Sequence, residues 1–98
     1  MKWAFIYCGI GCSADLHHTE LTYRDGNRNL HVYGVSSIDE GCALAKRLVD
    51  EGFLLLELCG GFGEEGCRKV IAATNNKVLV GYIAYLPENE DRRALLPQ

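Results

Sequence analysis

Residues 54–68, which read LLLELCGGFGEEGCR, are the most informative part of the sequence. Its apolar first part predicts a buried strand over 53–58, its glycines predict a tight turn, and the rest predicts the beginning of a helix. In open α/β sheets, ligands usually bind where a strand ends and the chain turns into a helix. The stretch therefore marks a candidate site without naming its chemistry.

Strands and helices continue on both sides of this stretch. The Asp25-Gly26 pair predicts a hairpin turn, because such turns require a positive φ. Ser37 and Glu40 have the spacing of a capping box at the start of a helix, and Gly52 suits the left-handed residue that ends it. Further strands are predicted over residues 2–8, 19–24, 29–36 and 78–86, and a second helix over 63–74.

The order of these elements predicts a small two-layer α/β sandwich, with the order β-β-β-α-β-α-β. Each strand–helix–strand unit is expected to form a right-handed crossover, so the last three strands run parallel to one another. We expect a sheet that is mostly parallel in its second half and has a hairpin in its N-terminal half. Residues 1–98 are expected to form a single domain, with residues 88–98 as a loose or docking tail.

The direction of the first strand stays open, because its pattern does not show which strands it pairs with. If this strand runs parallel to the later ones, Cys8, Gly9 and Gly11 lie at the same sheet edge as Cys59 and Gly60. The candidate site would then combine residues from both ends of the chain.

Composition limits the classes of function. The chain has 98 residues, which gives one modest core that buries roughly 60–65% of the unfolded surface. A net charge of −3 without a basic run argues against nucleic-acid binding. No apolar stretch approaches the roughly 20 residues of a membrane span, so no membrane partner is expected. The odd number of cysteines, five, and the lack of an export signal predict reduced thiols and a cytoplasmic protein.

The apolar pattern also bears on assembly. The strands at 53–58 and 78–86 are apolar on both faces, as is typical of strands covered on both sides. Two helices do not suffice to cover both faces of five strands. If both helices lie on one face, the other exposes an apolar area large enough to drive association. We therefore expect a homodimer with two-fold symmetry.

Glu57 is the polar residue of an otherwise apolar strand. A carboxylate there must be paired, hydrogen-bonded or neutralised, or else exposed at the end of the sheet, because an isolated buried charge is costly. Perturbed carboxyls of this kind are common in functional sites. One hypothesis is therefore an enzyme that uses Glu57 as a general acid or base, with Cys59 as a nucleophile close to a helix N-terminus.

Residues 61–66 match the pattern G-x-G-x-x-G of dinucleotide-binding turns. The match is weak, because glycine is dense here and because Glu64 and Glu65 occupy the position of a pyrophosphate. Two carboxylates in the first helical turn complement the helix dipole themselves and repel an anion. A tight turn that leads into a charge-capped helix is the favoured interpretation.

Metal binding was weighed for the loop that carries Cys12, His17 and His18. Thiolates and imidazoles are good zinc ligands, and Cys8 and Cys59 could lie nearby. However, the chain lacks the C-x-x-C pairs that such sites use, and adjacent histidines in polar loops are usually solvated. We assign no metal site and no cofactor.

Several stretches resemble a known family. They are the opening KWAFI at residues 2–6, VSSIDEGCALAK at 35–46, ELCGGFGEEG at 57–66 and VLVGY at 78–82. Together they resemble a family of small prokaryotic proteins of about this length that is catalogued only as a domain of unknown function. The E-L-C-G-G-F-G block is the most specific element. The resemblance implies a small cytosolic α/β protein and brings no activity, cofactor or catalytic residue.

Three functions follow as hypotheses. The leading one is a binding protein that holds a small molecule at the glycine-rich turn beside Glu57 and Cys59, with Phe62 as an apolar lid. The second is the small enzyme described above. The third is a structural or interaction protein without a ligand. The expected ligand-binding residues are Gly9, Gly60, Gly61, Phe62 and Gly63.

Overall fold

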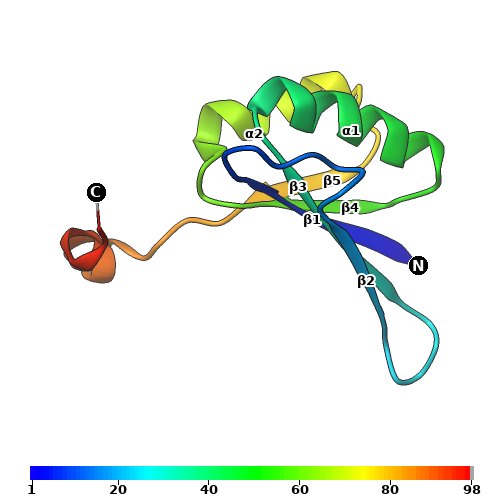
Figure 1. Cartoon of the computed structure of the whole chain (residues 1–98), viewed down its shortest axis with the longest axis horizontal. Coiled ribbons are helices and arrows are strands. Elements are labelled where there is room, and N and C mark those ends of the chain that lie inside the picture. Colours follow the sequence, from blue (N-terminus) through cyan, green and yellow to red (C-terminus); the bar gives the residue numbers. More distant parts are fainter. Residues whose placement is uncertain (98) are drawn as a thin grey trace.

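A computed structural model describes residues 1–97 of the chain. The predicted α/β class and element order are confirmed, with two helices packed on one face of a five-stranded sheet (Figure 1). The elements are β1 (Lys2–Cys8), β2 (His18–Thr22), β3 (Asn29–Val35), α1 (Ile38–Asp50), β4 (Leu55–Leu58), α2 (Gly63–Ala73), β5 (Leu79–Tyr82) and the 3₁₀-helix η1 (Pro87–Leu95).

The sheet has the strand order β2-β3-β1-β4-β5. The expected hairpin is present, because β2 pairs antiparallel with β3 at one edge. The direction left open by the sequence is parallel: β1 lies in the middle and runs parallel to both β3 and β4, with Ile6 opposite Tyr33 and Leu58. The carboxyl ends of β1 and β4 therefore share one edge of the sheet, as the sequence indicated for a parallel first strand.

Both helices lie on the same face for a topological reason. The connection from β3 to β4 passes over β1, and the connection from β4 to β5 moves on in the same direction. Right-handed crossovers that progress in one direction place their helices on one side of the sheet. The edge-on view in Figure 1 shows α1 and α2 side by side above the strands, with no helix below them.

Local signals set the boundaries of α1. The Oγ atom of Ser37 accepts a hydrogen bond from the backbone N–H of Glu40 at 3.1 Å. The carboxylate of Glu40 accepts one from the backbone N–H of Ser36 at 2.8 Å, one residue before the cap. Gly52 ends the helix with a φ of 91°, a region that favours glycine. Both predicted boundaries are thereby confirmed.

The core lies between the helices and one face of the sheet. β1 contributes Ala4 and Ile6, and β4 contributes Leu56 and Leu58, all of them fully buried. Alternate residues of a strand point to opposite faces, so the residues between these four point away from the helices. The other buried apolar residues are Tyr33, Val35, Leu44, Ala45, Leu48, Phe53, Phe62, Cys67 and Val70.

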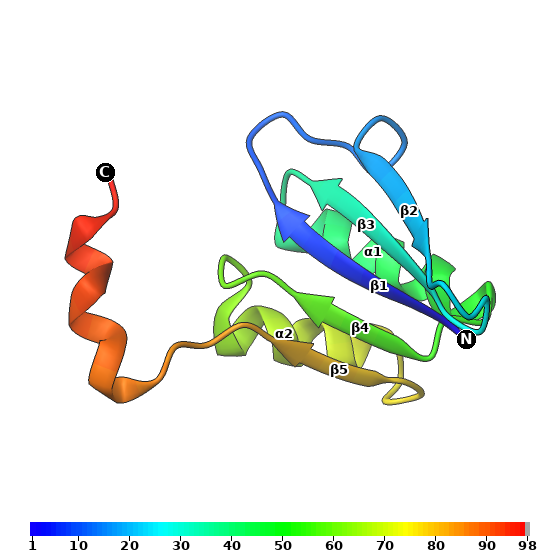
Figure 2. The same ribbon diagram turned by 90° about the horizontal axis from the view of Figure 1, so that it is seen from below.

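In the part of the chain that the structure describes, no helix lies over the opposite face of the sheet, which we call the open face (Figure 2). Most of its side chains are apolar and partly or largely exposed; Leu79 is 71% exposed and Leu21 is 59% exposed. The strand register brings the following residues to this face: Trp3, Phe5, Tyr7, Thr19, Leu21, Leu30, Val32, Gly34, Leu55, Glu57, Leu79 and Gly81.

The last strand is shorter than its sequence pattern indicated. A strand over 78–86 was expected, but β5 ends at Tyr82. Its neighbour β4 ends at Leu58, which lies opposite Tyr82, so later residues have no strand to pair with. The N–H of Ile83 donates the last hydrogen bond, to the carbonyl of Leu58 at 2.9 Å.

Residues 83–97 then leave the sheet, and we call them the C-terminal arm. The arm passes the carboxyl edge of the strands and carries η1 away from the rest of the chain in both views (Figures 1 and 2). Every residue of the arm is exposed. Within residues 1–97, no helix combines the length and the apolar character needed to cross a membrane.

Candidate functional site

The glycine-rich turn joins β4 to α2 through two tight backbone hydrogen bonds. The N–H of Phe62 donates to the carbonyl of Cys59, and the N–H of Gly63 donates to that of Gly60, each at 3.1 Å. Gly63 has a φ of 64°, which a side chain would make strained. The turn therefore needs glycine for its backbone path, independently of any ligand.

Phe62, which was expected as a lid over a ligand, lies in the core and is 3% exposed. Its ring fits against α1 at Gly41, where an added Cβ would lie 2.7 Å from the ring. An added Cβ on Gly66 would lie 3.0 Å from the Cβ of Phe62. Glycine at 66, the last position of the G-x-G-x-x-G pattern, thus permits close packing between Phe62 and α2 instead of marking a nucleotide.

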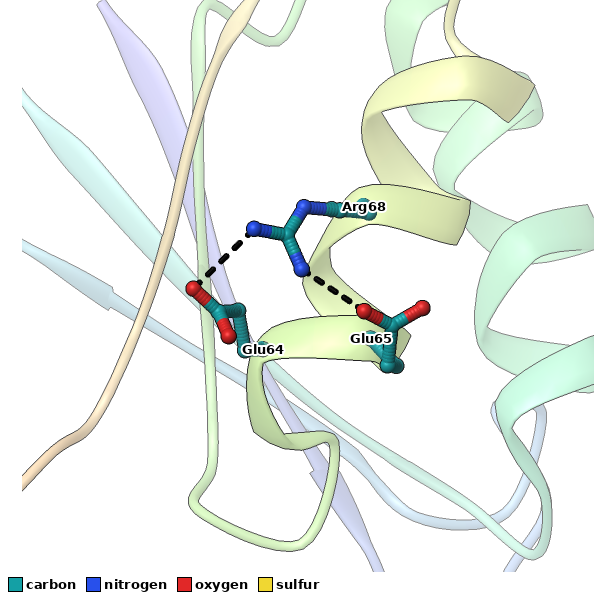
Figure 3. Close-up of polar contacts among 3 residues, drawn as sticks. All are labelled: Glu64, Glu65 and Arg68. Atoms are coloured by element: carbon teal, nitrogen blue, oxygen red, sulfur yellow. Dashed lines mark hydrogen bonds and ion pairs between the residues drawn. The ribbon is translucent and has the colours of Figure 1, made fainter.

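The first turn of α2 carries its own negative charge. Arg68 bridges two carboxylates, with one nitrogen 3.1 Å from Glu64 and the other 2.6 Å from Glu65 (Figure 3). These carboxylates lie where the positive end of the helix dipole would attract an anion. The arrangement agrees with a charge-capped helix and leaves no attraction for a phosphate.

Two thiols meet at the carboxyl edge of the sheet. The backbone N–H of Cys8 donates a hydrogen bond to the Sγ atom of Cys59 at 3.2 Å. Burial raises the pKa of the Cys8 thiol, and the neighbouring Cys59 raises it further. Since the thiolate is the nucleophilic form, a raised pKa disfavours reactivity at Cys8. All five cysteines are free thiols.

Gly9 follows Cys8 at this edge and is fixed by the backbone. Its N–H donates to the carbonyl of Val35 at 2.8 Å, and its own carbonyl accepts from the N–H of Cys12. A Cβ at this position would lie 2.8 Å from the Sγ of Cys12, so glycine allows the loop to fold closely over the strand end.

Glu57 lies on the open face, away from the thiols. Its register partners are Phe5 on β1 and Gly81 on β5, and its side chain makes no hydrogen bond or ion pair within residues 1–97. Because Gly81 has no side chain, space is left beside the carboxylate: an added Cβ there would meet nothing within 4 Å. The result is a hollow of about 270 Å³, lined by Leu55, Glu57, Leu79, Val80, Gly81, Tyr82 and Ile83.

Cys59 does not line that hollow. The enzyme hypothesis requires Glu57 and Cys59 to face a common cavity, and the fold directs them to different surroundings. Glu57 faces solvent on the open face, whereas Cys59 accepts an N–H at the sheet edge and lies close to Gly61. Catalysis by this pair stays a prediction that none of these contacts favours.

The loop residues that could serve as zinc ligands are separated in the fold. His17 bonds through Nδ1 to the backbone of Ser13, 3.0 Å from its N–H. His18 instead stacks on Tyr33, with ring centroids 4.2 Å apart. In the part of the chain that the structure describes, no group of three or more His, Cys, Asp or Glu residues is placed to hold a metal ion.

The sequence interpretation missed a histidine cluster on the hairpin. His31 lies 3.2 Å from the carboxylate of Glu20 and 3.0 Å from the ring nitrogen of His18, and its side chain is 12% exposed. Its ring packs against the ring of Phe53, with centroids 4.9 Å apart and an angle of 75° between the planes. Burial lowers the pKa of His31, and this effect outweighs the attraction of Glu20. The period-two alternation of the two predicted strands could have shown that these residues share one face.

Fold and site together define a small α/β protein with a helix-covered face, an apolar open face and a projecting arm. The chain belongs to the family described as "Family of unknown function (DUF6506)", whose model matches residues 1–96. No curated protein and no solved structure matches the chain significantly. A ligand at the glycine-rich turn, held by Gly60, Gly61 and their neighbours, remains a prediction.

Proposed function

We propose that the protein is an interaction module whose open face binds a second copy of the chain. The observation that carries this proposal is that one face of the sheet is mostly apolar and is covered by no helix of residues 1–97. Trp3, Phe5 and Val32 lie on its central strands. Monomeric soluble proteins rarely expose contiguous apolar patches larger than a few hundred Å².

Aromatic side chains support an interface in particular. Trp3, Phe5 and Tyr7 are the open-face residues of β1, whereas the covered face of the same strand uses Ala4 and Ile6. Protein interfaces are enriched in aromatic residues, which bury much area with few rotatable bonds. Burial stabilises association by about 25 cal/mol for each Å² of apolar surface, against the cost of lost translational and rotational freedom.

A two-fold dimer suits such a face, because the same patch then serves both copies. The open face supplies fewer residues than the roughly 20–30 per side that stable interfaces use. Residues outside the sheet must therefore contribute to the contact.

The test is the molar mass of the full chain in solution, measured by size-exclusion chromatography with light scattering. We expect a dimer at micromolar concentration and a monomer for Phe5→Lys, with the circular dichroism unchanged. The control is Ala72→Lys, which adds the same charge on the exposed side of α2 and should stay dimeric. A monomeric wild-type chain, or a dimeric Phe5→Lys variant, contradicts the proposal.

A second candidate function is binding of a small molecule with an apolar body and a cationic group. The specific observation is the unpaired carboxylate of Glu57 beside the hollow of about 270 Å³ over Gly81. Ligand sites are commonly apolar hollows with a few polar groups that fix orientation. The ligand of this candidate binds on the open face beside β4 and β5, instead of at the glycine-rich turn that follows β4.

This candidate is tested by mass spectrometry of gently purified protein under native and denaturing conditions. An organic ligand gives extra mass on the native wild-type chain that is lost on denaturation. The extra mass should be absent from Gly81→Val, whose side chain enters the hollow at a position where an added Cβ meets nothing within 4 Å. Native chains that carry no extra mass, or a variant that retains it, contradict a ligand in this hollow.

A further inference from the structure

Within residues 1–97, no helix or strand covers the C-terminal arm, which approaches the rest of the chain where the Tyr85 hydroxyl lies 4.0 Å from the Cβ position of Gly60. Its apolar side chains Ile83, Tyr85, Leu86, Leu95 and Leu96 are all exposed. Both views show the arm apart from the sheet, beyond the carboxyl edge of the strands (Figures 1 and 2). The arm therefore presents apolar surface that needs a partner as much as the open face does.

The conformation of the arm supports a docked state. η1 has nine residues, begins at Pro87 and is braced by Arg93, which pairs with Glu90 at 3.1 Å and lies over the ring of Tyr85. Runs of 3₁₀-helix longer than three or four residues are uncommon, and short isolated helices are marginal in water. Packing against another surface would supply the stability that the exposed helix lacks.

The charges of the arm and of the open face indicate that these two surfaces are complementary. Arg92 makes no ion pair within residues 1–97, in contrast to its neighbour Arg93. Arg92, Tyr85 and Leu96 line one hollow of the arm together with Asn89 and the paired Glu90 and Arg93, so Arg92 is the cation on this side without an ion pair within residues 1–97. The open face has the complementary character: it is apolar around a single carboxylate, Glu57, which also lacks a partner in the described chain.

We infer that the arm of one copy covers the open face of a second copy, with the Arg92 guanidinium reaching the Glu57 carboxylate beside Gly81. This inference rests on the proposed self-association and names the segment that completes it. In a two-fold dimer the exchange is reciprocal, since each arm covers the partner's face. An arginine suits this pairing, because its planar fork can bind a carboxylate through two hydrogen bonds.

The experiment uses two full-length charge reversals, Glu57→Arg and Arg92→Glu, studied by sedimentation equilibrium. Each variant alone places like charges together in both contacts of its dimer. We expect its dissociation constant to rise by about tenfold or more, as for like charges across an interface. Lys69→Glu is the control: it makes the same charge change as Arg92→Glu, but on α2, and should leave dimerisation unchanged.

Mixing the two variants then shows whether the contact crosses between copies. In the mixed dimer, one contact is the original Arg92–Glu57 pair and the other is the reversed pair, so both are attractive. Native mass spectrometry should show heterodimers at concentrations where neither variant dimerises alone. An arm that docks on its own chain gains nothing from mixing, so an unchanged monomeric mixture overturns the inference.

The outcomes separate the inference from the proposal beneath it. If Arg92→Glu dimerises as the wild type does while Phe5→Lys is monomeric, the arm is not the covering segment but the open face is still the interface. If Phe5→Lys is also dimeric, both statements are wrong.

Discussion

The two faces of the sheet differ in the side chains that the same strands place on them. On the covered face, β1 and β4 present Ala4, Ile6, Leu56 and Leu58, which are fully buried under the helices. On the open face, the residues between them are larger, more often aromatic and only partly covered. A close-packed core favours side chains that fill a fixed space, whereas an interface favours aromatic rings that offer a large contact area.

The largest expected effect comes from breaking the covered face. Phe62→Ala removes a ring that is 3% exposed and leaves a cavity between Gly41 and Gly66, which should cost about 3–5 kcal/mol of unfolding free energy. Phe5→Ala removes a ring of the open face, and its smaller cost should shrink on dilution as the dimer dissociates. Urea unfolding at two protein concentrations measures both. If Phe62→Ala loses no more unfolding free energy than Phe5→Ala, the assignment of Phe62 to the core and of Phe5 to the open face is contradicted.

Substitutions at two glycines, Gly41 on α1 and Gly81 on the open face, test the difference between the two faces. Gly41→Val forces a side chain against the Phe62 ring, which lies 2.7 Å from the Cβ position, and should destabilise by about 1–3 kcal/mol. Gly81→Val meets open space on a strand, where a β-branched residue is favoured, and should leave the fold as stable or up to about 1 kcal/mol more stable. The thermal unfolding midpoints of the two variants test this difference. Equal shifts of the two midpoints would mean that both faces of the sheet are equally covered.

The stability of the fold should depend on pH through His31, which lies on β3 near the edge of the covered face. His31 has a lowered pKa in the folded chain because of burial, with Glu20 and Glu51 opposing this effect and His18 and Lys2 reinforcing it. The unfolded chain then binds more protons below the ordinary histidine pKa near 6.5, so stability is full above that pH and falls as the pH drops through the lower folded pKa.

This dependence is measured by chemical unfolding from pH 7.5 to 5 in the wild type and in His31→Gln. The wild type should lose more stability than the variant over this window. Parallel curves would show that His31 does not titrate with folding.

The smallest effect is expected at the ion pairs of α2. Arg68→Ala frees Glu64 and Glu65, yet all three side chains are largely exposed. Exposed pairs of this kind contribute little, so unfolding free energy should change by less than about 0.5 kcal/mol. A calorimetric shift comparable with that of Gly41→Val would mean that the turn depends on this network and not on the packing of Phe62.

The sequence predicted what depends on nearby residues. Ser37, Glu40 and Gly52 delimit α1 because capping chemistry acts within a few residues of the helix end. The sequence pattern predicted the strands at 2–8 and 29–36, which correspond to β1 and β3.

The remaining features depend on contacts between distant segments. Phe62 follows two glycines, as a lid might, but it is in the core because Gly41 leaves room for its ring. The strand pattern continues to 86, but β5 ends at Tyr82 because β4 ends opposite it. The hollow beside Glu57 arises from the pairing with Gly81, which no local pattern reveals.

We expect a second copy to cover the open face, and Trp3 is a built-in reporter of this contact. Trp3 is the one tryptophan of the chain and lies on this face, opposite Leu55. Its fluorescence, quenched with acrylamide over a dilution series, tests the claim directly. We predict emission that is shielded at micromolar concentration and becomes red-shifted and accessible as the dimer dissociates. A Trp3 that is equally accessible at every concentration would contradict the account.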